Sequence, residues 1–340
     1  MKAAVLKKIG KASEAFEIRE VEDPKPKEGE VLVKIEAFGL NFADVMARNG
    51  LYREAPPLPS ILGYDFVGRV IETTHKDQEH LLNKRVAGLS RFGSYAELVA
   101  TRAEGMVIIP EDLDAAKATA LGTQYATAFH SACQMTNLQK GDKVLIHAAA
   151  GGVGTALIQL ARWKGCTIFG TVGSDEKAKH ILKLGAHHAI NYRESNYEEK
   201  INELLDGERL DLTFNPIAGS TFKKDLKLLG SGGRMILFGA AERSGMKGGK
   251  LATYRFLWKM GLLMPILLMA KSRSIIGVNM LKVADHRPKL IGNALLELTQ
   301  LLGQGVIDPQ IGGVFEVEDI AKAHELLETR KTKGKIAVKW

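Results

Sequence analysis

The feature that most constrains the fold is a run of small residues between an apolar stretch and an amphipathic one. The run reads AAAGGVG at residues 148–154, after the apolar stretch 143–147 and before the stretch 155–162. Such a run lets the chain turn sharply off a strand, lets the backbone approach a pyrophosphate, and lets the following helix pack closely on the strand. The helix then presents free backbone N–H groups to the phosphates. A tight turn made only for packing would look similar, but the strand-like and helix-like flanks favour a dinucleotide-binding turn with Ala149 in place of the first glycine.

The rest of the sequence shows two different patterns of expected secondary structure. From the small-residue run to residue 238, strand-like and helix-like segments alternate, which is typical of a parallel sheet with helices on both faces. Residues 1–110 instead contain short β-branched runs broken by glycine, proline and charged turns, and the C-terminal tail holds further β runs. We therefore predict an α/β protein with a discontinuous β-rich catalytic domain, residues 1–122 and 287–340. A doubly wound parallel Rossmann domain, residues 123–286, is inserted into it, and the cleft between the domains is the expected active site.

Composition narrows the class of protein further. The chain of 340 residues has two cysteines, Cys133 and Cys166, too few for a disulfide framework or a four-cysteine zinc site. The sequence contains no stretch of 18 or more uninterrupted apolar residues, so it predicts no ordinary membrane-spanning helix. The first residues lack the long apolar core of a secretory signal. These observations predict a cytoplasmic protein.

The net charge of +8 is unevenly distributed along the chain. Between Lys223 and Lys289 there are 14 lysines and arginines against three acidic residues, so this segment carries +11 and the remainder about −3. Such a segment is either a solvated basic face or a surface that faces anions. Nucleic acid is an unlikely partner, because the basic stretch contains no recognised module and few aromatic residues.

Four longer segments carry a resemblance to a known family. These are residues 40–70 (LNFADVMARNGLYREAPPLPSILGYDFVGRV), 121–132 (LGTQYATAFHSA), 140–165 and 184–193 (LGAHHAINYR). They resemble the medium-chain dehydrogenase/reductase superfamily, within it the zinc-free quinone oxidoreductase branch, and most closely the vesicle amine transport protein subgroup. The resemblance covers essentially the whole chain. It implies a GroES-like β-barrel catalytic domain, an NADPH-binding Rossmann domain and often a homodimer.

The same resemblance argues against a metal. Zinc alcohol dehydrogenases of this superfamily place a cysteine where this chain has Asn41, and Gly-His-Glu where it has residues 63–65, Gly-Tyr-Asp. The cysteines of a structural zinc site are absent, and no two histidines have the i, i+4 spacing of a helical metal site. We therefore expect no zinc and no other catalytic metal. The loop at 72–84 departs from the family pattern and carries no prediction.

The end of the second Rossmann strand favours NADPH over NADH. A protein that binds NAD needs a carboxylate there for the ribose hydroxyls. The strand 167–172 is followed instead by Gly173 and Ser174, which do not repel a phosphate. The resemblance implies that Lys177 neutralises the 2′-phosphate and that Tyr192 packs beside it. Asp175 would oppose a phosphate if it pointed inward, and the alternative interpretation is an ordinary helix N-terminus with a capping residue.

The remaining predicted cofactor contacts lie at the glycine turn and at the ends of other strands, where Rossmann ligands bind. The full predicted set is Thr127, Ala150, Gly151, Gly152, Val153, Gly154, Gly173, Ser174, Lys177, Tyr192, Asn215, Phe238, Gly239, Ala240, Gly277 and Val278.

The absence of zinc shapes the expected chemistry. Without a Lewis acid to polarise an alcohol or ketone, the substrate should already be electron-poor, such as a quinone or an α,β-unsaturated carbonyl (enone). The resemblance places Asn41 and Asp44 at the cleft and makes Tyr52 the phenol nearest to the nicotinamide. Tyr52 would donate a hydrogen bond to the developing oxyanion, or would merely pack on the prolines at 56–59. Two other functions stay open: a 2-enoyl-thioester reductase, and an NADPH-binding protein that acts mainly through a membrane or macromolecular partner.

Two further segments predict surfaces. Residues 271–280 form a β run that, in the family, pairs with its symmetry mate, and an exposed strand edge would otherwise favour aggregation, so we predict a homodimer over a monomer with a covered edge. Residues 253–270 carry Arg255 and Lys259 beside a broad apolar surface, and Pro265 should end or kink the first helix. We expect this segment to be too short to span a bilayer. The preferred interpretation is a lid over the substrate cleft; the others are peripheral membrane contact, helped by Lys247, Lys250, Lys271 and Arg273, and core or dimer packing.

Overall fold

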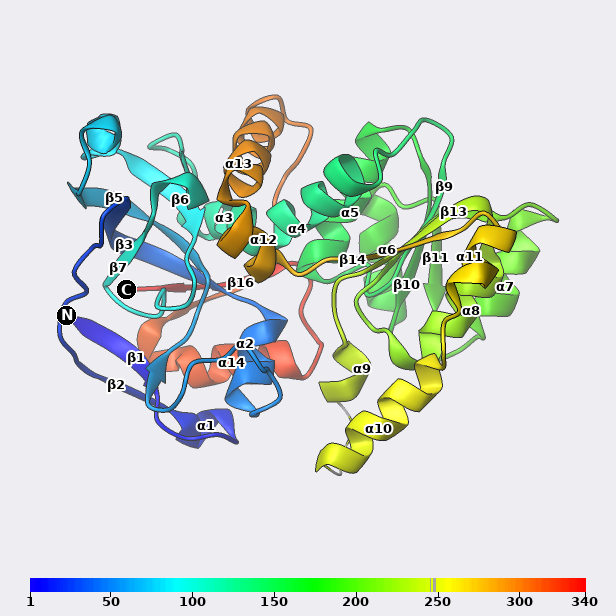
Figure 1. The fold of residues 1–340 in the computed structure, drawn as a ribbon, viewed down its shortest axis with the longest axis horizontal. Helices are drawn as coiled ribbons and strands as arrows, with labels where there is room; N and C mark the ends of the chain where they lie inside the picture. The colour runs from blue at the N-terminus through cyan, green and yellow to red at the C-terminus, as the bar shows by residue number, and fades with distance from the viewer. Residues whose placement is uncertain (245, 247–248) are drawn as a thin grey trace. The chain divides into compact units, whose positions relative to one another are not determined.

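The structure is a computed structural model of the chain, and it describes all residues except 245, 247 and 248; the side chain of Lys250 is also not described. Lys247, which the sequence pointed to as a basic neighbour of the segment 253–270, therefore lies outside the described residues. The chain divides into two compact units, which are described separately (Figure 1). Unit 1 comprises residues 1–126 and 280–340, and unit 2 comprises residues 127–279.

These boundaries differ from the expected ones, 122/123 and 286/287. The first falls inside an almost continuous helical run from Ala115 to Met135, which contains no proline to mark the division. The second lies earlier because the helix Met280–His286 packs on unit 1: Leu281 joins a buried cluster with Leu89, and Asp285 accepts a 2.5 Å hydrogen bond from Arg91. The packing of this helix, which the sequence pattern does not report, therefore sets the second boundary.

Unit 1 is built mainly from antiparallel strands. Its strands are β1 (Lys2–Leu6), β2 (Phe16–Glu20), β3 (Glu30–Leu40), β4 (Ser60–Ile61), β5 (Asp65–Thr73), β6 (Arg85–Leu89), β7 (Leu98–Arg102), β8 (Met106–Ile108), β15 (Ile311–Glu316) and β16 (Lys335–Lys339). Its helices are α1 (Ala12–Ala15), α2 (Phe42–Arg48), α3 (Ala115–Ala120), α12 (Met280–His286), α13 (Pro288–Gly303) and α14 (Ile320–Glu328). One sheet has the order β2-β1-β4, and the other has the order β15-β16-β3-β5-β6-β8, with β7 paired to β3.

The long strand β3 is the centre of unit 1. Its first half buries Val31, Val33 and Ile35 in one apolar cluster, and its second half buries Phe38 and Leu40 in another. The inward-facing positions change from odd to even numbers because the pairing with β5 shifts register between Ile35 and Ala37. This irregularity brings the end of β3, and the Asn41 that follows it, to the second cluster.

Unit 2 is the predicted parallel α/β unit. Its strands are β9 (Lys143–Ile146), β10 (Thr167–Val172), β11 (His188–Asn191), β12 (Leu210–Asn215), β13 (Leu229–Leu237) and β14 (Ser274–Gly277). Its helices are α4 (Ala126–Phe129, at the boundary), α5 (Gly152–Trp163), α6 (Asp175–Leu184), α7 (Tyr197–Leu205), α8 (Phe222–Leu228), α9 (Ala241–Ser244), α10 (Gly249–Met260) and α11 (Pro265–Ala270). All strand pairs are parallel and the order is β11-β10-β9-β12-β13-β14, as in a doubly wound Rossmann sheet. The predicted α/β fold is confirmed.

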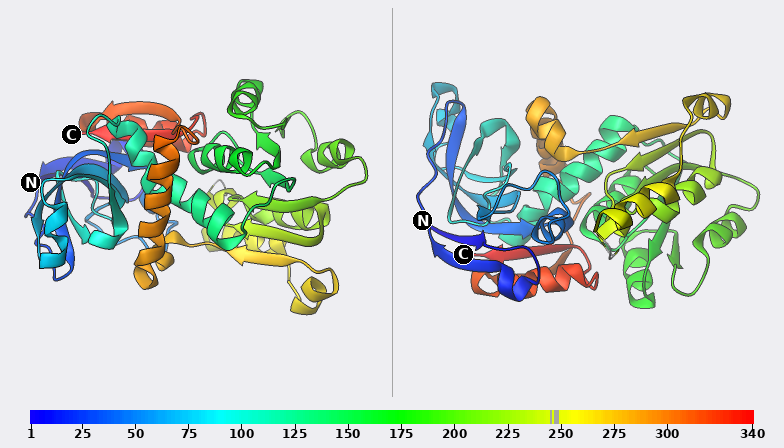
Figure 2. Two further views of the ribbon diagram at one scale, coloured as in Figure 1. Left: turned by 90° about the horizontal axis from the view of Figure 1, so that it is seen from above. Right: turned by 60° about the horizontal axis from the view of Figure 1, so that its bottom comes forward.

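The apolar segment between β13 and β14 corrects one expectation. Residues Leu251–Ala270 have a mean hydropathy of 1.2 over a window that is 11% buried, so by length and composition they could cross a membrane. The search for 18 uninterrupted apolar residues did not find this segment, because Arg255 and Lys259 interrupt its apolar sequence. Helix α10 nevertheless ends at Met260 and α11 begins at Pro265, as the proline predicted. Both views in Figure 2 show α11 (gold) at the periphery of unit 2.

Candidate functional site

The glycine turn of unit 2 has the geometry that the sequence predicted. The chain leaves β9 through Ala148, whose φ of 50° is left-handed, and α5 begins with Gly151 as its N-cap. A Cβ atom on Gly154 would lie 2.5 Å from the Ala148 carbonyl oxygen and 2.7 Å from the Ala149 Cα, so only glycine allows helix and strand to pack this closely. Residues 151–153 remain partly exposed. The first N–H groups of α5 are therefore available to an anion.

The other predicted strand-end residues gather at the same edge of the sheet. Strands β9 and β12 are neighbours at which the strand order reverses, and ligands bind beside the carboxyl ends of strands at such a switch point. Gly239 follows β13 and lies so close to β12 that a Cβ atom would be 2.7 Å from the Pro216 carbonyl oxygen. Beside it, the N–H of Val278 donates to the Leu237 carbonyl over 2.8 Å. The predicted residues 238–240 and 277–278 are thus adjacent in space.

Asn215 does not offer its side chain to a ligand. Its Nδ2 donates to Thr221 Oγ1 over 2.8 Å and to Asp225 Oδ2 over 2.7 Å, while its Oδ1 accepts from the N–H groups of Ile217 and Ala218. All four of these hydrogen-bonding positions are used inside unit 2. The side chain of Asn215 therefore shapes the loop after β12, and its predicted contact with the cofactor stays a prediction.

A buried polar network holds this loop, and sequence reasoning missed it. The fully buried carboxylate of Asp225 accepts hydrogen bonds from Asn215, from the Tyr197 hydroxyl over 2.9 Å and from His147 Nε2 over 3.0 Å. His147 Nδ1 lies 2.9 Å from the Thr171 Oγ1 on β10. The network ties β9, β10, β12 and α8 together at the ligand edge of the sheet.

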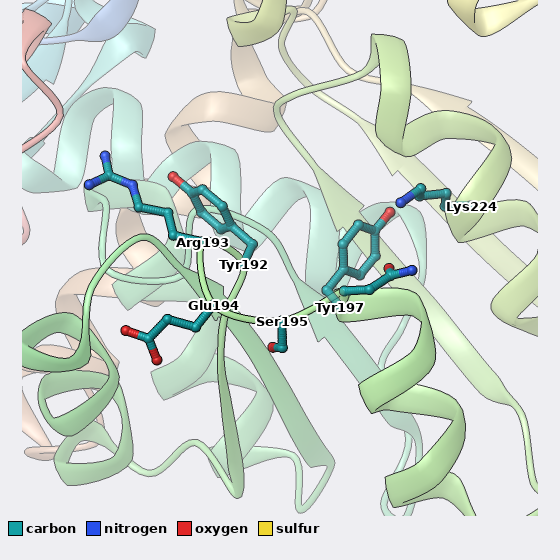
Figure 3. Close-up of a pocket in the computed structure, with 7 residues that line it drawn as sticks. Tyr192, Arg193, Glu194, Ser195, Tyr197 and Lys224 are labelled. Atoms are coloured by element: carbon teal, nitrogen blue, oxygen red, sulfur yellow. The ribbon is translucent and has the colours of Figure 1, made fainter.

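The end of β10 forms a second recess. A Cβ atom on Gly173 would lie 2.7 Å from the Tyr192 hydroxyl oxygen and 3.5 Å from the Arg193 Nε, so both side chains lie over this glycine. Ser174 caps α6, and its Oγ accepts from the Lys177 N–H over 3.4 Å. Figure 3 shows Tyr192 and Arg193 side by side, with Glu194 directed away from them, at a shallow pocket of about 350 Å³.

Two details of this recess refine the sequence prediction. Asp175 is exposed, and its Oδ1 accepts a 3.0 Å hydrogen bond from Asn191 Nδ2, so its carboxylate is held by a neighbouring amide. Arg193 was not among the predicted residues, although it ends the segment LGAHHAINYR that carried the resemblance. It supplies a planar cation with several N–H donors, which suits a phosphate monoester better than lysine alone does.

Thr127 is buried at the start of unit 2. Its predicted place at the nicotinamide, like the predicted cleft between the domains, stays a prediction.

In unit 1, Asn41 is the centre of a buried polar cluster. It follows β3 and caps α2, where its backbone N–H donates to Asp44 Oδ2 over 2.8 Å. Its Nδ2 donates to Asp65 Oδ2 over 2.7 Å, and its Oδ1 accepts from Lys335 Nζ over 3.1 Å. Lys335 also forms a close ion pair with Asp65, and both side chains are fully buried. Thr123 donates a short hydrogen bond to the other Asp65 oxygen.

This donor set does not fit a zinc ion. An amide at position 41 and a phenol at position 64 replace the sulfur and imidazole ligands that zinc prefers, and the carboxylate at position 65 is already neutralised by the Lys335 ammonium. Across the part of the chain that the structure describes, no group of three or more His, Cys, Asp or Glu side chains could hold a metal ion. Lys335 was missed by sequence reasoning because nothing local distinguishes it from the other lysines of the C-terminal tail.

Asp44 lies in an unusual environment for a carboxyl group. It is completely buried, and burial raises its pKa to about 7, although the hydrogen bond from the Asn41 backbone opposes the shift. The Tyr95 hydroxyl is also close to Asp44 and lies 3.2 Å from His324 Nε2. A proton on His324 Nδ1 would be a buried donor without a partner among the described residues, so the Nε2 tautomer is favoured; it donates to Tyr95 and leaves the Tyr95 O–H for Asp44.

Tyr52 lies where this buried cluster approaches the surface. It is partly buried and packs with the buried Tyr64. Burial raises the pKa of the Tyr52 phenol, and the neighbouring Tyr64 phenol partly offsets this effect. The charge of Asp44 raises the pKa of both phenols as well. Burial of the acidic groups therefore increases from Tyr52, which is partly buried, to Tyr64 and Asp44, which are buried.

The comparisons with known proteins agree with both units. Residues 27–111 match the alcohol dehydrogenase GroES-like domain, and residues 152–294 match the zinc-binding dehydrogenase family. The chain is 33% identical over 315 residues to the human synaptic vesicle membrane protein VAT-1 homolog, which covers 92% of this chain and 79% of that protein. It is also 33% identical to human quinone oxidoreductase, over 89% of this chain and 86% of that protein.

Among solved structures, Escherichia coli quinone oxidoreductase complexed with NADPH superposes over 100% of both chains, with a TM-score of 0.86 at 28% identity. The predicted GroES-like domain and Rossmann domain are confirmed. The chain therefore belongs to the medium-chain dehydrogenase/reductase superfamily, in the branch that contains the quinone oxidoreductases and the VAT-1 homologues.

Proposed function

We propose that this chain is an NADPH-dependent oxidoreductase that reduces a quinone or an α,β-unsaturated carbonyl without a metal ion. The observation that carries the cofactor assignment is the recess over Gly173, where Tyr192 and Arg193 meet beside Ser174. The choice of substrate is supported by the human and bacterial quinone oxidoreductases to which the chain is similar.

The described residues fit the cofactor. The start of α5 offers backbone N–H groups for the pyrophosphate, and Gly154 lets this helix pack closely on the chain that leaves β9. Arg193 and Lys177 supply positive charge for the 2′-phosphate, and Asp175 is held by Asn191. Bound NADPH supplies the hydride; the residues of the chain bind and orient it.

The proposed absence of zinc follows from the cluster around Asn41. Because the Lys335 ammonium is paired with Asp65 inside the protein, this cluster has its own cation, and the Asp65 carboxylate is not free for a metal. Without a Lewis acid, the substrate must accept a hydride readily, as quinones and enones do.

The reduction of a quinone to a hydroquinone consumes one hydride and one proton. We assign the proton to Tyr52, whose O–H donates it to the substrate oxygen as negative charge develops there. The carboxyl of Asp44, with its pKa raised to about 7 by burial, holds a proton near neutral pH, and its ionised form makes Tyr52 a weaker acid. Tyr52 recovers its proton from solvent, so charge balances over one turnover.

A substrate panel tests this function. The oxidation of NADPH is followed by its absorbance with quinones, enones and 2-enoyl thioesters as acceptors. We expect turnover with quinones or enones. Turnover with enoyl thioesters alone would instead establish the alternative reductase, and tight NADPH binding without any turnover would establish a binding protein that acts through a partner.

We also propose a homodimer formed through β14. This strand is at the end of the sheet order in unit 2, and its Ile275 and Ile276 are only partly buried. An unpaired edge of this kind favours pairing with a second copy. Light scattering should give about twice the 37.1 kDa of one chain; a mass near 37.1 kDa at micromolar concentration would exclude the dimer.

A further inference from the structure

The segment from α10 to α11 exposes far more apolar surface than any other part of the described chain. Of 22 large apolar side chains that are exposed among the described residues, ten lie between Leu251 and Met269. Trp258 is 84% exposed, Leu262 100% and Met269 73%. Contiguous apolar surface on this scale marks a binding site for a partner or a membrane.

One face of α10 anchors the segment to unit 2. Ala252 and Phe256, one helical turn apart, are buried, and the ring of Phe256 packs near Gly219. The opposite face carries Tyr254, Leu257 and Trp258, which are all exposed. The helix therefore has its packing face satisfied and presents a second apolar face outward, which packing within unit 2 does not explain.

The charge of the segment identifies the partner. The sequence from Arg243 to Ala284 contains eight lysines and arginines and no aspartate or glutamate. On α10, Tyr254, Arg255, Trp258 and Lys259 together line a shallow depression of about 320 Å³. Aromatic rings beside cationic groups, next to aliphatic side chains, are the combination found where proteins contact the headgroup region of an anionic bilayer.

A second copy of the chain has another place to bind in the proposed dimer. That dimer pairs through β14 (Ser274–Gly277), which lies outside α10 and α11. The predicted lid over the substrate cleft stays a prediction.

The segment is built to lie on a bilayer rather than to cross it. Helix α10 has 12 residues and α11 has six, separated by residues 261–264. At about 1.5 Å per residue neither helix reaches across a hydrocarbon core of about 30 Å. Leu262 in the connection is fully exposed, so it is the tip of the apolar surface.

We propose that the α10–α11 segment docks unit 2 onto an anionic lipid bilayer, with Trp258 and Leu262 inserted among the headgroups and acyl chains and Arg255 beside the lipid phosphates. The docking surface shares no residue with the Gly173 recess or with the Asn41 cluster. It therefore stands or falls independently of the proposed reductase activity.

Vesicle flotation of the full chain tests the proposal. Wild-type protein should float with vesicles of phosphatidylcholine and phosphatidylglycerol in equal parts, and much less with phosphatidylcholine alone. Binding should weaken when salt is raised from about 0.05 M to about 0.5 M, since the attraction to anionic lipid is screened. Arg255→Gln should lower the partition coefficient about fivefold, and Trp258→Glu or Leu262→Glu should lower it at least tenfold.

Leu182→Glu is the matched control. Leu182 is 46% exposed on α6, so this variant places the same charge on unit 2 outside the segment and should float like wild type. Equal thermal unfolding and unchanged NADPH binding would show that each variant is folded. The proposal would be overturned if wild-type protein did not float with anionic vesicles at low salt, or if Leu262→Glu protein floated like wild type. It would also be overturned if Trp258→Glu changed only the mass measured by light scattering and not flotation. That last result would assign the surface to a second copy of the chain.

Discussion

Replacing Lys335 with methionine should destabilise unit 1 by about 3–5 kcal/mol. The substitution keeps the length of the side chain but leaves the Asp65 carboxylate, which is fully buried, without its cation. Asp65 would retain hydrogen bonds from Asn41 and Thr123, so we expect the lower part of this range. The double variant Lys335→Met/Asp65→Asn removes both charges and should recover most of the loss.

The assay is urea unfolding followed by tryptophan fluorescence. Trp340 is the tryptophan of unit 1, whereas Trp163 and Trp258 belong to unit 2, so a Trp163→Phe/Trp258→Phe background isolates unit 1. Lys339→Met is the control, because Lys339 lies on the same strand but is exposed, and its loss should change stability by less than about 0.5 kcal/mol. A Lys335→Met protein within about 1 kcal/mol of wild type would refute the role of the internal cation, and so would a double variant less stable than the single one.

Three further substitutions test the site. Gly154→Ala should raise the Kd for NADPH by a factor of about ten or more, which corresponds to ~1.4 kcal/mol of binding free energy. The reason is that the alanine Cβ would meet the backbone of residues 148 and 149. An unchanged Kd in calorimetric titration would contradict the turn geometry. Tyr52→Phe should lower kcat about 100-fold with little change in the KM for NADPH, and full retention of kcat/KM would remove Tyr52 from the chemistry. The kcat of wild-type protein should decline as pH rises through about 7, because ionised Asp44 makes Tyr52 a weaker acid, and Asp44→Asn should lack this decline. The raised pKa also means that the stability Asp44 contributes is complete below about pH 4 and is lost as pH rises through about 7, so urea midpoints of Asp44→Asn should vary less with pH than those of wild type.

Local sequence patterns were enough to predict the Rossmann unit. The turn at 148–154 depends on residues that are adjacent in the chain, and each strand of unit 2 is a short apolar run followed by a helix. The recess at Gly173 could be predicted for the same reason, because Ser174 and Lys177 lie in the next turn of helix.

The contacts that could not be predicted join residues far apart in the sequence. Lys335 reaches Asp65 across 270 positions, and His147 reaches Asp225 across 78. No periodicity or spacing reports such a pairing, so Lys335 looked like any lysine. The segment 251–270 shows a related limit: its apolar composition is visible in the sequence, but whether those side chains are covered depends on the packing around them.

The most direct test of the proposed function is the ratio of kcat/KM for NADPH to that for NADH, measured with the best quinone or enone acceptor. Wild-type protein should prefer NADPH strongly. Arg193→Gln should reduce the ratio about 10- to 100-fold by removing charged hydrogen bonds to the 2′-phosphate while leaving the NADH value unchanged. Lys179→Gln, an exposed lysine on the same helix as Lys177, should leave the ratio as it is. A wild-type ratio near or below one, or an Arg193→Gln protein with an undiminished ratio, would contradict the assignment of the Gly173 recess as the site that selects NADPH.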